Sequence, residues 1–447
     1  MNICVVGLGY VGLVTAACLA ELGHEVLGID IDSNKISMLK EGEMPIYEPG
    51  LRELISKNHM EGRLSFANSV NTDLDKATLI FIAVGTPSNQ DGTPNLTSVY
   101  QSLDSLLPFI KSYKIFVLKS TVPIGTNHEV KKYLSNKLKT EFDIVSNPEF
   151  LKEGTAVQDF MKPDRIVIGA ESIKAQEIMK DLYSHFTRNG HPVLVMDLLS
   201  AETVKYASNL MLALKVSFIN EIALLCDSIG ADIRRVKEGI IGDPRIGSQF
   251  LYPSIGFGGS CLPKDVQALM YFIKENSIDL LIPKATLHAN EKQASWFINK
   301  IINYFGADKI QSKTLALWGT SFKAGTDDIR ESPAIRIIEG LGKIGVKLKL
   351  YDPIALKNTK KYFASSAFKN KIEYGTNEMD SVRGSDALVV CTEWMQFRSP
   401  NFEKLAGELK DKVIFDGRNL YDPEKLKLFG LSHVGVGIPA NKVKTKV

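Results

Sequence analysis

The stretch of this chain best suited to chemistry is Gly256-Phe257-Gly258-Gly259-Ser260-Cys261-Leu262-Pro263-Lys264-Asp265. Three glycines within four positions allow the backbone to turn tightly and to approach a ligand closely. Apolar residues recur at helical spacing from Leu262 onward, and Pro263 suits a first helical turn. We therefore expect Cys261 at a helix N-terminus beside Lys264, where the helix dipole and the cation both favour a thiolate. The alternative is a glycine loop around a buried, inert cysteine.

A second motif predicts a dinucleotide site near the N-terminus. The segment Gly7-Leu8-Gly9-Tyr10-Val11-Gly12 follows an apolar run at residues 2–6 and precedes a helical pattern at residues 13–22. A strand at residues 25–29 then ends in Asp30, 23 positions after Gly7. In this context Gly7 makes the turn, Gly9 admits the pyrophosphate and Gly12 allows close helix–sheet packing. Asp30 would bind the adenosine ribose and repel a 2′-phosphate, which favours NAD over NADP; the alternative is a glycine turn in another α/β domain.

Polar side chains follow further predicted strands. The apolar runs at residues 78–84, 115–119 and 142–145 end in turn segments that carry Thr86, Thr121, Glu149 and, a few residues on, Glu153. Ligands of open parallel sheets lie at the carboxyl ends of the strands, so we expect these side chains to face a common cleft. A single threonine could instead cap a turn.

A long, mostly apolar helix is predicted at residues 201–229, as a buried central element. Lys205 and Asn209 are four positions apart and would lie on one face of it. The alternative for Lys205 is a surface lysine whose stem covers apolar neighbours.

The first pattern returns after residue 313. A strand at 314–318, a polar loop, a helix from Ser332 and Pro333 to about residue 341, a glycine and a strand at 346–350 are followed by Asp352, and further strands are expected at 386–390 and 413–415. No G-x-G-x-x-G is present, so the ligand is not expected to be a dinucleotide. Lys323, Arg330 and Arg418 are donors suited to phosphate or uracil. The predicted fold class is α/β, with two Rossmann-like, doubly wound parallel-sheet domains joined by a long central helix, at residues 1–199, 200–300 and 301–447.

Composition narrows the class of protein. The 447 residues are 44% hydrophobic and 23% charged, with a net charge of +3, which gives no case for nucleic acid or a membrane surface. We find no apolar run that reads as a bilayer span and no signal peptide. Five widely spaced cysteines without a Cys-x-x-Cys pair suit a reducing, cytoplasmic compartment, and all but Cys261 lie in apolar patterns expected in the core. The seven histidines show no metal-ligand spacing, and the basic tail at 441–447 has no assigned role.

The motifs, taken together, resemble the nucleotide-sugar dehydrogenases of the UDP-glucose/GDP-mannose family. The matching segments are residues 7–12, Gly85-Thr86-Pro87, Ser120-Thr121-Val122-Pro123, Asn147-Pro148-Glu149-Phe150-Leu151-Lys152-Glu153-Gly154, Lys205 with Asn209, Arg245-Ile246-Gly247, residues 256–265, Phe322-Lys323 and Phe415-Asp416-Gly417-Arg418. The resemblance implies two Rossmann-type domains bridged by a long helix that also forms a homodimer interface.

The resemblance also implies a four-electron oxidation of UDP-glucose to UDP-glucuronate with NAD, through a thiohemiacetal and a thioester on Cys261. Lys205, Asn209 and Asp265 would supply the base for the hydroxyl proton, directly or through an ordered water, and Lys205 and Asn209 would stabilise the oxyanion. Glu149, helped by Thr121, would activate the hydrolytic water. The same chemistry on GDP-mannose or a UDP-N-acetylhexosamine is an alternative, and an inactive nucleotide-sugar-binding protein is another.

Substrate choice depends on the residues before the cysteine. The Arg-Ile-Gly stretch with Phe250 and Tyr252 looks like the sugar loop of UDP-glucose enzymes, in which the arginine matching Arg245 reaches the substrate of the partner subunit. The UDP-N-acetylmannosamine members usually have histidine where this chain has Ser260.

The residues assigned in this way form two sets beside the six catalytic candidates. The cofactor set is Gly7, Gly9, Tyr10, Val11, Gly12, Asp30, Lys35, Thr86, Thr121, Glu153, Lys264 and Arg330. The substrate set is Glu149, Phe150, Leu151, Glu153, Lys205, Asn209, Arg245, Phe250, Tyr252, Ser254, Gly258, Lys323 and Arg418.

Overall fold

The computed structural model describes residues 1–439 except 71, 88 and 90–92, so the basic tail at 441–447 lies outside the described residues. The chain forms two compact units. The N-terminal unit comprises Met1–Ser208 and Gln267–Ile278, and the C-terminal unit comprises Asn209–Val266 and Asp279–Val447. Each unit is described by itself.

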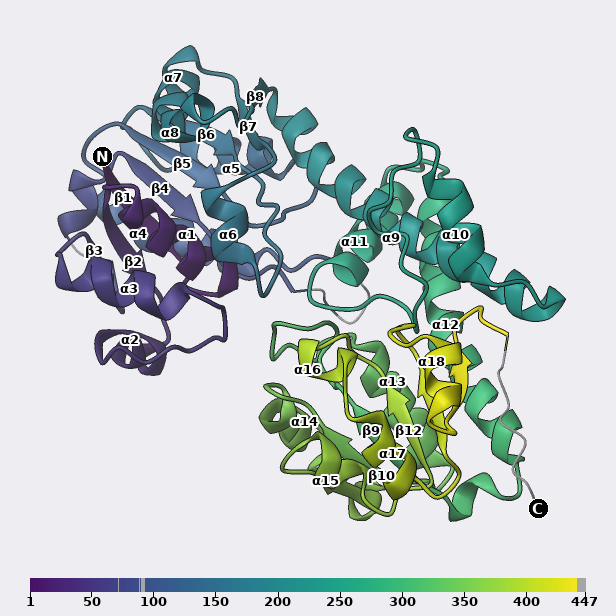
Figure 1. The fold of residues 1–447 in the computed structure, drawn as a ribbon. Coiled ribbons are helices and arrows are strands. Elements are labelled where there is room, and N and C mark those ends of the chain that lie inside the picture. The colour runs from purple at the N-terminus through teal and green to yellow at the C-terminus, as the bar shows by residue number, and fades with distance from the viewer. Residues whose placement is uncertain (71, 88, 90–92, 440–447) are drawn as a thin grey trace. The chain divides into compact units, whose positions relative to one another are not determined.

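The N-terminal unit is built on an eight-stranded sheet of order β3-β2-β1-β4-β5-β6-β7-β8 (Figure 1). Its first six strands have the order of a dinucleotide-binding fold. The strands are β1 (Asn2–Val6), β2 (Glu25–Ile29), β3 (Leu64–Ala67), β4 (Leu79–Ile82), β5 (Lys114–Leu118), β6 (Phe142–Ser146), β7 (Ile166–Ala170) and β8 (Val193–Met196). The last residues of β1, β4, β5 and β6 are in register, so the residues that follow them form a row along one edge of the sheet.

One pair in this sheet departs from the predicted parallel arrangement, because β6 and β7 are antiparallel. An antiparallel neighbour begins at the edge where the previous strand ends. The connection at 147–165 therefore has no need to cross the sheet, and the segment around Glu149 stays at the carboxyl edge.

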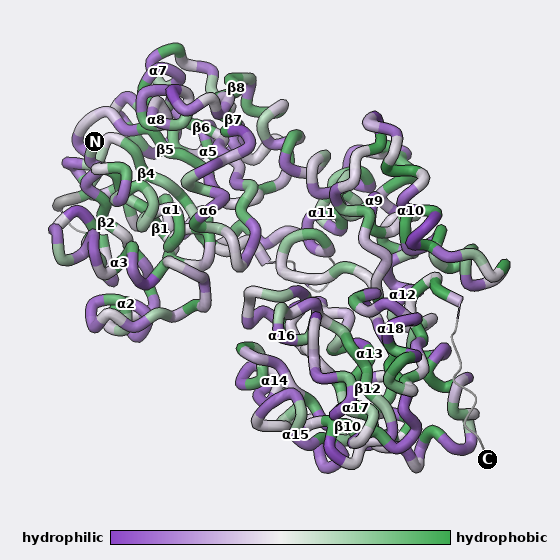
Figure 2. Tube along the Cα trace, in the orientation of Figure 1, coloured by the Kyte–Doolittle hydropathy of each residue, from purple (hydrophilic) through white to green (hydrophobic). Residues whose placement is uncertain are grey.

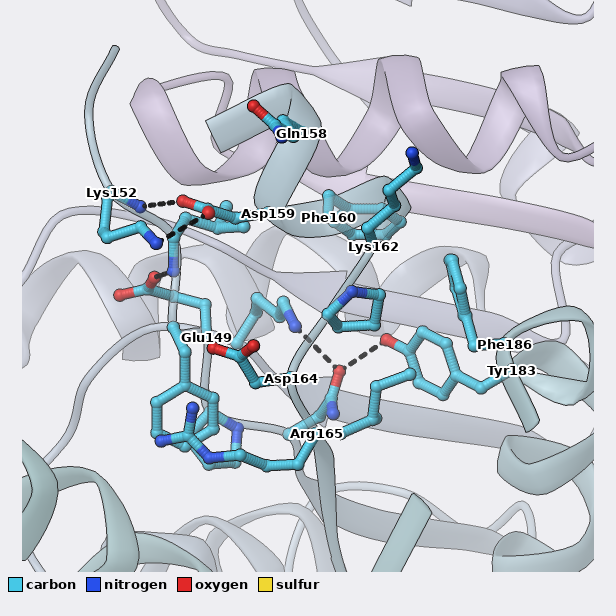
Figure 3. A pocket seen from close by; sticks show the side chains of 17 residues that line it. Glu149, Lys152, Gln158, Asp159, Phe160, Lys162, Asp164, Arg165, Tyr183 and Phe186 are labelled. Atoms are coloured by element: carbon cyan, nitrogen blue, oxygen red, sulfur yellow. Dashed lines mark hydrogen bonds and ion pairs between the residues drawn. The ribbon is translucent and has the colours of Figure 1, made fainter. Parts of the chain in front are cut away.

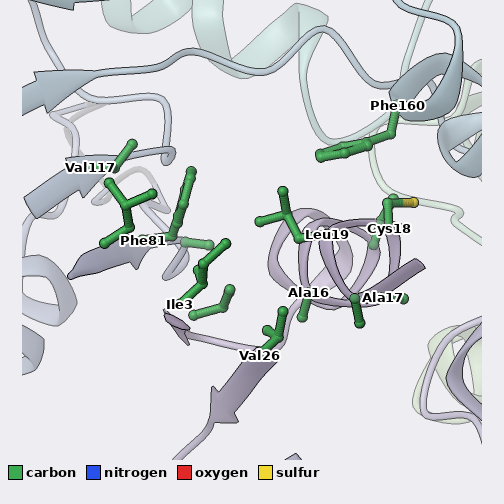
Figure 4. Close-up of a cluster of buried hydrophobic side chains, with 14 of the residues drawn as sticks. Ile3, Ala16, Ala17, Cys18, Leu19, Val26, Phe81, Val117 and Phe160 are labelled. Atoms are coloured by element: carbon green, nitrogen blue, oxygen red, sulfur yellow. The ribbon is translucent and has the colours of Figure 1, made fainter. Parts of the chain in front are cut away.

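Helices cover this sheet and bury an apolar core. They are α1 (Tyr10–Glu21), α2 (Ser33–Lys40), α3 (Leu51–Met60), α4 (Thr97–Leu106), α5 (Thr126–Ser135), α6 (Ala156–Met161), α7 (Ile173–Leu182) and α8 (Ser184–Arg188), with short 3₁₀ turns η1 (Thr72–Lys76) and η2 (Leu107–Phe109). Figure 4 shows Leu19 of α1 among Ile3, Phe81 and Phe160, which come from two strands and α6. Helix α1 and the neighbouring strands are mostly hydrophobic along their length (Figure 2).

The C-terminal unit contains a six-stranded sheet of order β11-β10-β9-β12-β13-β14, with every pair parallel. Its strands are β9 (Thr314–Trp318), β10 (Lys347–Tyr351), β11 (Ile372–Tyr374), β12 (Ala387–Val390), β13 (Val413–Asp416) and β14 (Ser432–Gly435). Its helices are α10 (Ile233–Ile241), α12 (Leu281–Phe305), α13 (Pro333–Lys343), α14 (Leu356–Phe363), α15 (Glu378–Val382), α16 (Met395–Arg398), α17 (Phe402–Glu408) and α18 (Pro423–Leu428), with 3₁₀ turns η3 (Ile310–Ser312) and η4 (Lys369–Lys371).

Two helices run from one unit into the other, α9 (Leu198–Ile229) and α11 (Leu262–Glu275). The predicted fold class, with two doubly wound α/β sheets and a long central helix, is confirmed.

Helix α9 is less buried than the sequence predicts. Ala213 and Val216 pack into a small apolar cluster, whereas Met211, Phe218 and Leu225, at seven-residue spacing, are about half exposed (57%, 46% and 53%). By length and composition α9 is also the one helix in the described residues that could cross a membrane, contrary to our expectation. A core helix of a globular protein passes the same test, so this is weak evidence for a span.

Candidate active site

A cavity of about 620 Å³ opens at the carboxyl edge of the N-terminal sheet. Gly7 and Gly9 line it together with Asp30, Lys35 and Gly85, all at or just beyond the ends of β1, β2 and β4. This is the crevice in which doubly wound folds bind ligands, where the strand order reverses between β1 and β4.

The three motif glycines are required for different reasons. Gly7 has φ +90°, and a Cβ there would lie 2.9 Å from the carbonyl oxygen of Ala83. A Cβ on Gly12 would lie 1.8 Å from the carbonyl oxygen of Gly7, so helix and strand can approach only without it. A Cβ on Gly9 would meet no protein atom within 4 Å. The open space at Gly9, at the N-terminus of α1, fits the pyrophosphate of a dinucleotide.

Asp30 is oriented by its own neighbours. Its carboxylate accepts hydrogen bonds from the Leu8 amide (2.8 Å), the Asp32 amide (3.0 Å) and the Lys35 ammonium (2.7 Å). Burial would raise the pKa of Asp30, but these bonds, that of Lys35 first, hold the pKa below its usual value. An ionised carboxylate at the cavity edge suits a ribose and excludes a 2′-phosphate. Lys35, predicted to bind the cofactor, is hydrogen-bonded to the Asp30 carboxylate.

Tyr10 and Val11 form the first turn of α1. The Tyr10 hydroxyl donates to the carboxylate of Glu48 and accepts from the Gly154 amide at 2.9 Å. Burial, with the bond to Glu48, raises the pKa of Tyr10. The Tyr10 hydroxyl is therefore occupied by these partners, so a contact of Tyr10 with a cofactor would fall to its backbone amide.

The polar residues predicted at the carboxyl ends of β4, β5 and β6 are only partly joined by direct hydrogen bonds. The Thr86 hydroxyl donates to the carbonyl oxygen of Thr121 at 2.8 Å, so the ends of β4 and β5 are joined there. Glu153 lies near the end of the 147–154 segment and is half-buried.

Glu149 and Lys205 form a buried ion pair within the N-terminal unit. The Lys205 ammonium lies 2.8 Å from the Glu149 carboxylate and donates to the Glu149 carbonyl oxygen at 2.7 Å. The Leu151 amide donates to the other carboxylate oxygen at 2.6 Å. Burial opposes ionisation of Glu149, but the charge of Lys205 and these bonds lower its pKa. Lys205 is thus a buried charge, and the surface alternative does not apply.

The sequence analysis missed a second buried lysine in this region. Lys119 follows β5 and is 6% exposed, and its ammonium donates to the Asn147 side-chain oxygen at 3.0 Å. The Tyr183 hydroxyl donates to the same oxygen at 2.7 Å (Figure 3). Burial lowers the pKa of Lys119 to about 8, with Lys205 adding to the effect and Glu149 opposing it. Leu118 and Ser146, the last residues of β5 and β6, are in register, so the next residues, Lys119 and Asn147, are neighbours at the strand ends. The position of Lys119 directly after a predicted strand was the signal that could have identified it.

A cavity of about 250 Å³ adjoins the Glu149 segment (Figure 3). Glu149, Phe150 and Leu151 line it, and the Arg165 guanidinium stacks on the Phe150 ring at 3.6 Å. The Phe150 side chain of the predicted substrate segment is therefore packed against Arg165, at the other end of the 147–165 connection.

The predicted nucleophile lies in the C-terminal unit. Helix α11 begins at Leu262, and the Asp265 amide donates to the Cys261 carbonyl oxygen at 2.9 Å, so Cys261 is at the helix N-terminus as expected. Its side chain is partly exposed, and the Ser260 hydroxyl lies 3.5 Å from the sulfur. The other four cysteines are buried, as predicted, and burial raises the pKa of Cys4 and Cys18 to about 12.

Asp265 is 2% exposed and has two partners in this unit. The Asn209 side-chain amide donates to one carboxylate oxygen at 2.6 Å, and the Lys264 ammonium lies 2.8 Å from the other. Asn209 and Asp265, both catalytic candidates, are thus in direct contact. Lys264, predicted to bind the cofactor, forms an ion pair with Asp265.

The glycines of this loop are explained by the chain itself. A Cβ on Gly258 would lie 2.1 Å from the Glu331 carbonyl oxygen, and one on Gly259 would lie 2.7 Å from the Phe322 ring. Gly256, at φ +114°, approaches the Asn290 side chain in the same way. The close approach predicted for a ligand is therefore made, at these positions, to neighbouring protein segments.

Three buried amide side chains, none of them among the predicted site residues, hold the loop. Asn290 of α12 accepts from the Phe257 amide (2.8 Å) and donates to its carbonyl oxygen (3.0 Å). Gln293 donates to the Ser254 carbonyl oxygen (2.7 Å), and Asn220 of α9 accepts from the Ser254 amide (2.8 Å).

Some predicted substrate residues share a cavity of about 720 Å³ in the C-terminal unit. Tyr252, Ser254 and Arg418 line it, with the cationic Lys237 and Arg398. Arg418 pairs with Glu393, a half-buried residue that was not among the predicted site residues.

The remaining predicted contacts lie elsewhere. Phe250 packs beside the apolar cluster of α9, and the Lys323 ammonium lies 5.7 Å from the Phe322 ring. Arg245 and Arg330 are exposed and pair with Asp243 and Asp328, two residues before each of them.

The second sheet lacks an open acid at the equivalent of Asp30. Asp352 follows β10 and is 2% exposed. It accepts hydrogen bonds from the amides of Thr320 and Ser321 on one oxygen and of Ile354 and Ala355 on the other. These bonds saturate the carboxylate, so Asp352 presents no open acid comparable to Asp30. Among the described residues no group of three or more His, Cys, Asp or Glu side chains is placed to hold a metal.

Comparison with known proteins agrees with this arrangement. Three models of the UDP-glucose/GDP-mannose dehydrogenase family match the chain: the NAD binding domain at residues 1–187, the central domain at 199–292 and the UDP binding domain at 316–423. A UDP-glucose 6-dehydrogenase of Pseudomonas aeruginosa is 40% identical over 444 residues, covering 98% of each chain. UDP-glucose 6-dehydrogenase TuaD of Bacillus subtilis is 40% identical over 441 residues, covering 98% of this chain and 94% of the relative. The solved structure of a UDP-glucose dehydrogenase from Pyrobaculum islandicum is 34% identical, with a TM-score of 0.89 and 98% of each chain covered.

The sheet order, the glycine turn and Asp30 define an NAD-dependent oxidoreductase. More particularly, the chain belongs to the UDP-glucose/GDP-mannose dehydrogenase family.

Proposed function

We propose that the chain oxidises UDP-glucose to UDP-glucuronate in two successive two-electron steps, with Cys261 as the covalent nucleophile. The observation that carries the proposal is the partly exposed Cys261 at the N-terminus of α11, four residues before a buried Asp265 that is bonded to Asn209. The names of relatives that are 40% identical support the choice of sugar.

The first oxidation needs a base for the C6 hydroxyl proton. We assign this role to the set Lys205, Asn209 and Asp265: the Asp265 carboxylate would accept the proton, and Lys205 and Asn209 would hold the water through which it passes. NAD, when bound, accepts the hydride; Gly7 and Gly9 would hold its phosphates, and Asp30 its ribose.

The second oxidation needs a nucleophile, since an aldehyde has no second hydride to give until something has added to it. Attack of the Cys261 thiolate forms a C–S bond and a thiohemiacetal, and loss of hydride leaves a thioester. Lys205 and Asn209 would stabilise the oxyanion in this cycle.

Hydrolysis completes the reaction. A water adds to the thioester carbonyl, the C–S bond breaks, and the thiolate is regenerated with a carboxylate product. The lowered pKa of Glu149 keeps it ionised and ready to accept the water's proton, and Thr121 would help to place that water. Each sugar then consumes one water and gives up two hydrides.

The nucleotide is assigned to the C-terminal unit. Tyr252, Ser254 and Arg418 line a cavity with three further cations, Arg234, Lys237 and Arg398, which suits a diphosphate, and Lys323 would add a contact. In this division residues 1–199 bind NAD, 200–300 supply the helices and the thiol, and 301–447 bind UDP.

The half-exposed apolar face of α9 is proposed as the homodimer interface. Met211, Phe218 and Leu225 repeat every seven residues, and a surface of this kind is normally covered. Arg245, whose side chain is 87% exposed, is then available to a neighbouring subunit. Phe218→Glu should shift the mass measured by light scattering from dimer to monomer, and an unchanged dimer would count against this interface.

A cytoplasmic location is proposed from the cysteines. None of the five, all of them within the described residues, is in a disulfide, which suits a reducing compartment.

One assay tests the function. NADH formation is measured with limiting UDP-glucose, GDP-mannose or UDP-N-acetylmannosamine. Two NADH for each UDP-glucose, with little or none from the others, is the expected result. One NADH would indicate a two-electron dehydrogenase, turnover of GDP-mannose alone would reassign the substrate, and no NADH from any of them would leave a binding protein.

A further inference from the structure

We propose that Glu48 is a positioning residue that fixes the segment carrying Glu149 and Glu153 against the first turn of α1. It would thereby set the distance between the NAD site and the carboxylates used in the chemistry. This inference rests on the function proposed above.

The Glu48 carboxylate joins three separate parts of the chain. It accepts from the Tyr10 hydroxyl, from the Gly154 amide (2.6 Å) and from the Ala156 amide (2.7 Å). Tyr10 directly follows Gly9 of the glycine turn, and Gly154 directly follows Glu153. One side chain therefore links the neighbour of the proposed phosphate site to the neighbour of a proposed active-site carboxylate.

The contacts cannot be replaced by solvent at low cost. Glu48 is 6% exposed, and backbone amides left unpaired in so buried a setting are destabilising. The Ala156 amide belongs to the first turn of α6, whose N-terminus favours a negative charge. The raised pKa of Tyr10 keeps its hydroxyl protonated, so it remains a donor to the carboxylate.

The amide partners of the Glu48 carboxylate lie far along the chain from its own segment. Residues 41–50, between α2 and α3, form no helix or strand, and the amide partners of Glu48 are 106 and 108 residues away. Its function is to hold the distant segment, which is the expectation for a residue that positions an active site.

Two pairs of variants test the role, each with a matched control on the same segment. Glu48→Gln places an amide NH₂ against at least one backbone N–H and breaks that contact, whereas Glu43→Gln makes the same change at an exposed position. Tyr10→Phe removes only the hydroxyl, and Tyr47→Phe does so at a 40% exposed tyrosine. The measurements are kcat with UDP-glucose, NAD affinity by calorimetry without sugar, and amide hydrogen exchange in the peptide 151–160.

Glu48→Gln is expected to lower kcat about tenfold and to speed exchange in 151–160, with the Kd for NAD rising only about threefold, because Gly7, Gly9 and Asp30 keep their places. Tyr10→Phe should lose about two- to threefold in kcat, because the two amide contacts of Glu48 remain. Both controls should match the parent. A Glu48→Gln variant with parental kcat and exchange, or with a kcat reduced only in proportion to its unfolded fraction, would overturn the proposal. If the parent itself turned over no nucleotide sugar, the proposed function would fail, and exchange and NAD affinity would still decide the role of Glu48.

Discussion

The ammonium of Lys205 contacts both the carboxylate and the carbonyl oxygen of Glu149, at 2.8 and 2.7 Å. One lysine thus fixes the side chain and the backbone of the same residue. The pair is buried, so each charge depends on the other to remain ionised.

This dependence predicts a strong coupling in stability. Glu149→Gln and Lys205→Met should each lower the free energy of unfolding by about 3–5 kcal/mol, because each leaves a buried charge without its partner. The double variant should lose less than the sum of the two. Urea unfolding followed by far-UV circular dichroism measures all three, and simple additivity would show that the pair is not coupled.

Cys261→Ser should stop the reaction at the aldehyde stage, because without the thiol neither the thiohemiacetal nor the thioester can form. A serine hydroxyl is a poor nucleophile at neutral pH, so uronate formation is expected to fall about a thousandfold or more. Product analysis by mass spectrometry distinguishes aldehyde from uronate. Cys226→Ala, which removes a buried thiol in the same unit, should retain turnover. A serine variant that made uronate at the parental rate would rule out the covalent scheme.

The variants Gly9→Ala and Gly12→Ala distinguish a glycine required for ligand binding from a glycine required for packing within the protein. The Cβ at Gly12 would overlap the Gly7 carbonyl oxygen, so this variant should lose about 1–3 kcal/mol or more of stability. The Cβ at Gly9 meets no protein, so Gly9→Ala should melt at the parental temperature yet bind NAD weakly. Calorimetric melting and NAD titration test both, and normal NAD affinity of Gly9→Ala would contradict the placement of the pyrophosphate.

Asp30→Ala should relax the preference for NAD. It removes the carboxylate that repels a 2′-phosphate and releases the Lys35 ammonium that now bonds to it at 2.7 Å. The ratio of kcat/KM for NADP to that for NAD is expected to rise by at least tenfold, and the added change Lys35→Ala should reverse part of the gain. An unchanged ratio would mean that Asp30 does not face the ribose.

Lys119 predicts a pH-dependent stability. Its pKa is about 8 in the folded chain against an ordinary 10.5, so between these values the unfolded chain binds the proton and the folded chain does not. The stability contributed by this group therefore rises with pH across that window, by up to about 3 kcal/mol, and is smallest below pH 8. The difference in unfolding free energy between parent and Lys119→Met, measured from pH 7 to 10, should change in the parent's favour as pH rises. A constant difference would place the pKa of Lys119 outside this window.

Local sequence patterns predicted those features that depend on neighbours in the chain. The glycine turn directly follows strand β1, Asp30 directly follows β2, and the start of α11 is marked by Pro263. These positions carry their own conformational signals, so the sheets, the helix N-terminus at Cys261 and the acid after β2 were found where expected.

Features that depend on distant contacts were not predictable in this way. Asn290 meets Phe257 across 33 residues, and Glu48 meets Gly154 across 106, and neither side chain differs in type from an ordinary surface residue. The antiparallel β7 was missed because strand direction is set by the connection and leaves no mark on the strand itself. Glycines 258 and 259 were read as space for a ligand because their neighbours, Glu331 and Phe322, are far along the chain.

The backbone amides that donate to both oxygens of the Asp352 carboxylate bear on how often the NAD site is used in one reaction cycle. Within the described residues, only the sheet of the N-terminal unit pairs a glycine turn with an acid that lines a cavity. Under the proposed function, a sugar that gives up two hydrides would use this one dinucleotide site twice, and the site would have to reopen between the two oxidations. In that interval the bond to Cys261 would act as a tether, keeping the half-oxidised sugar on the enzyme until the second hydride can leave.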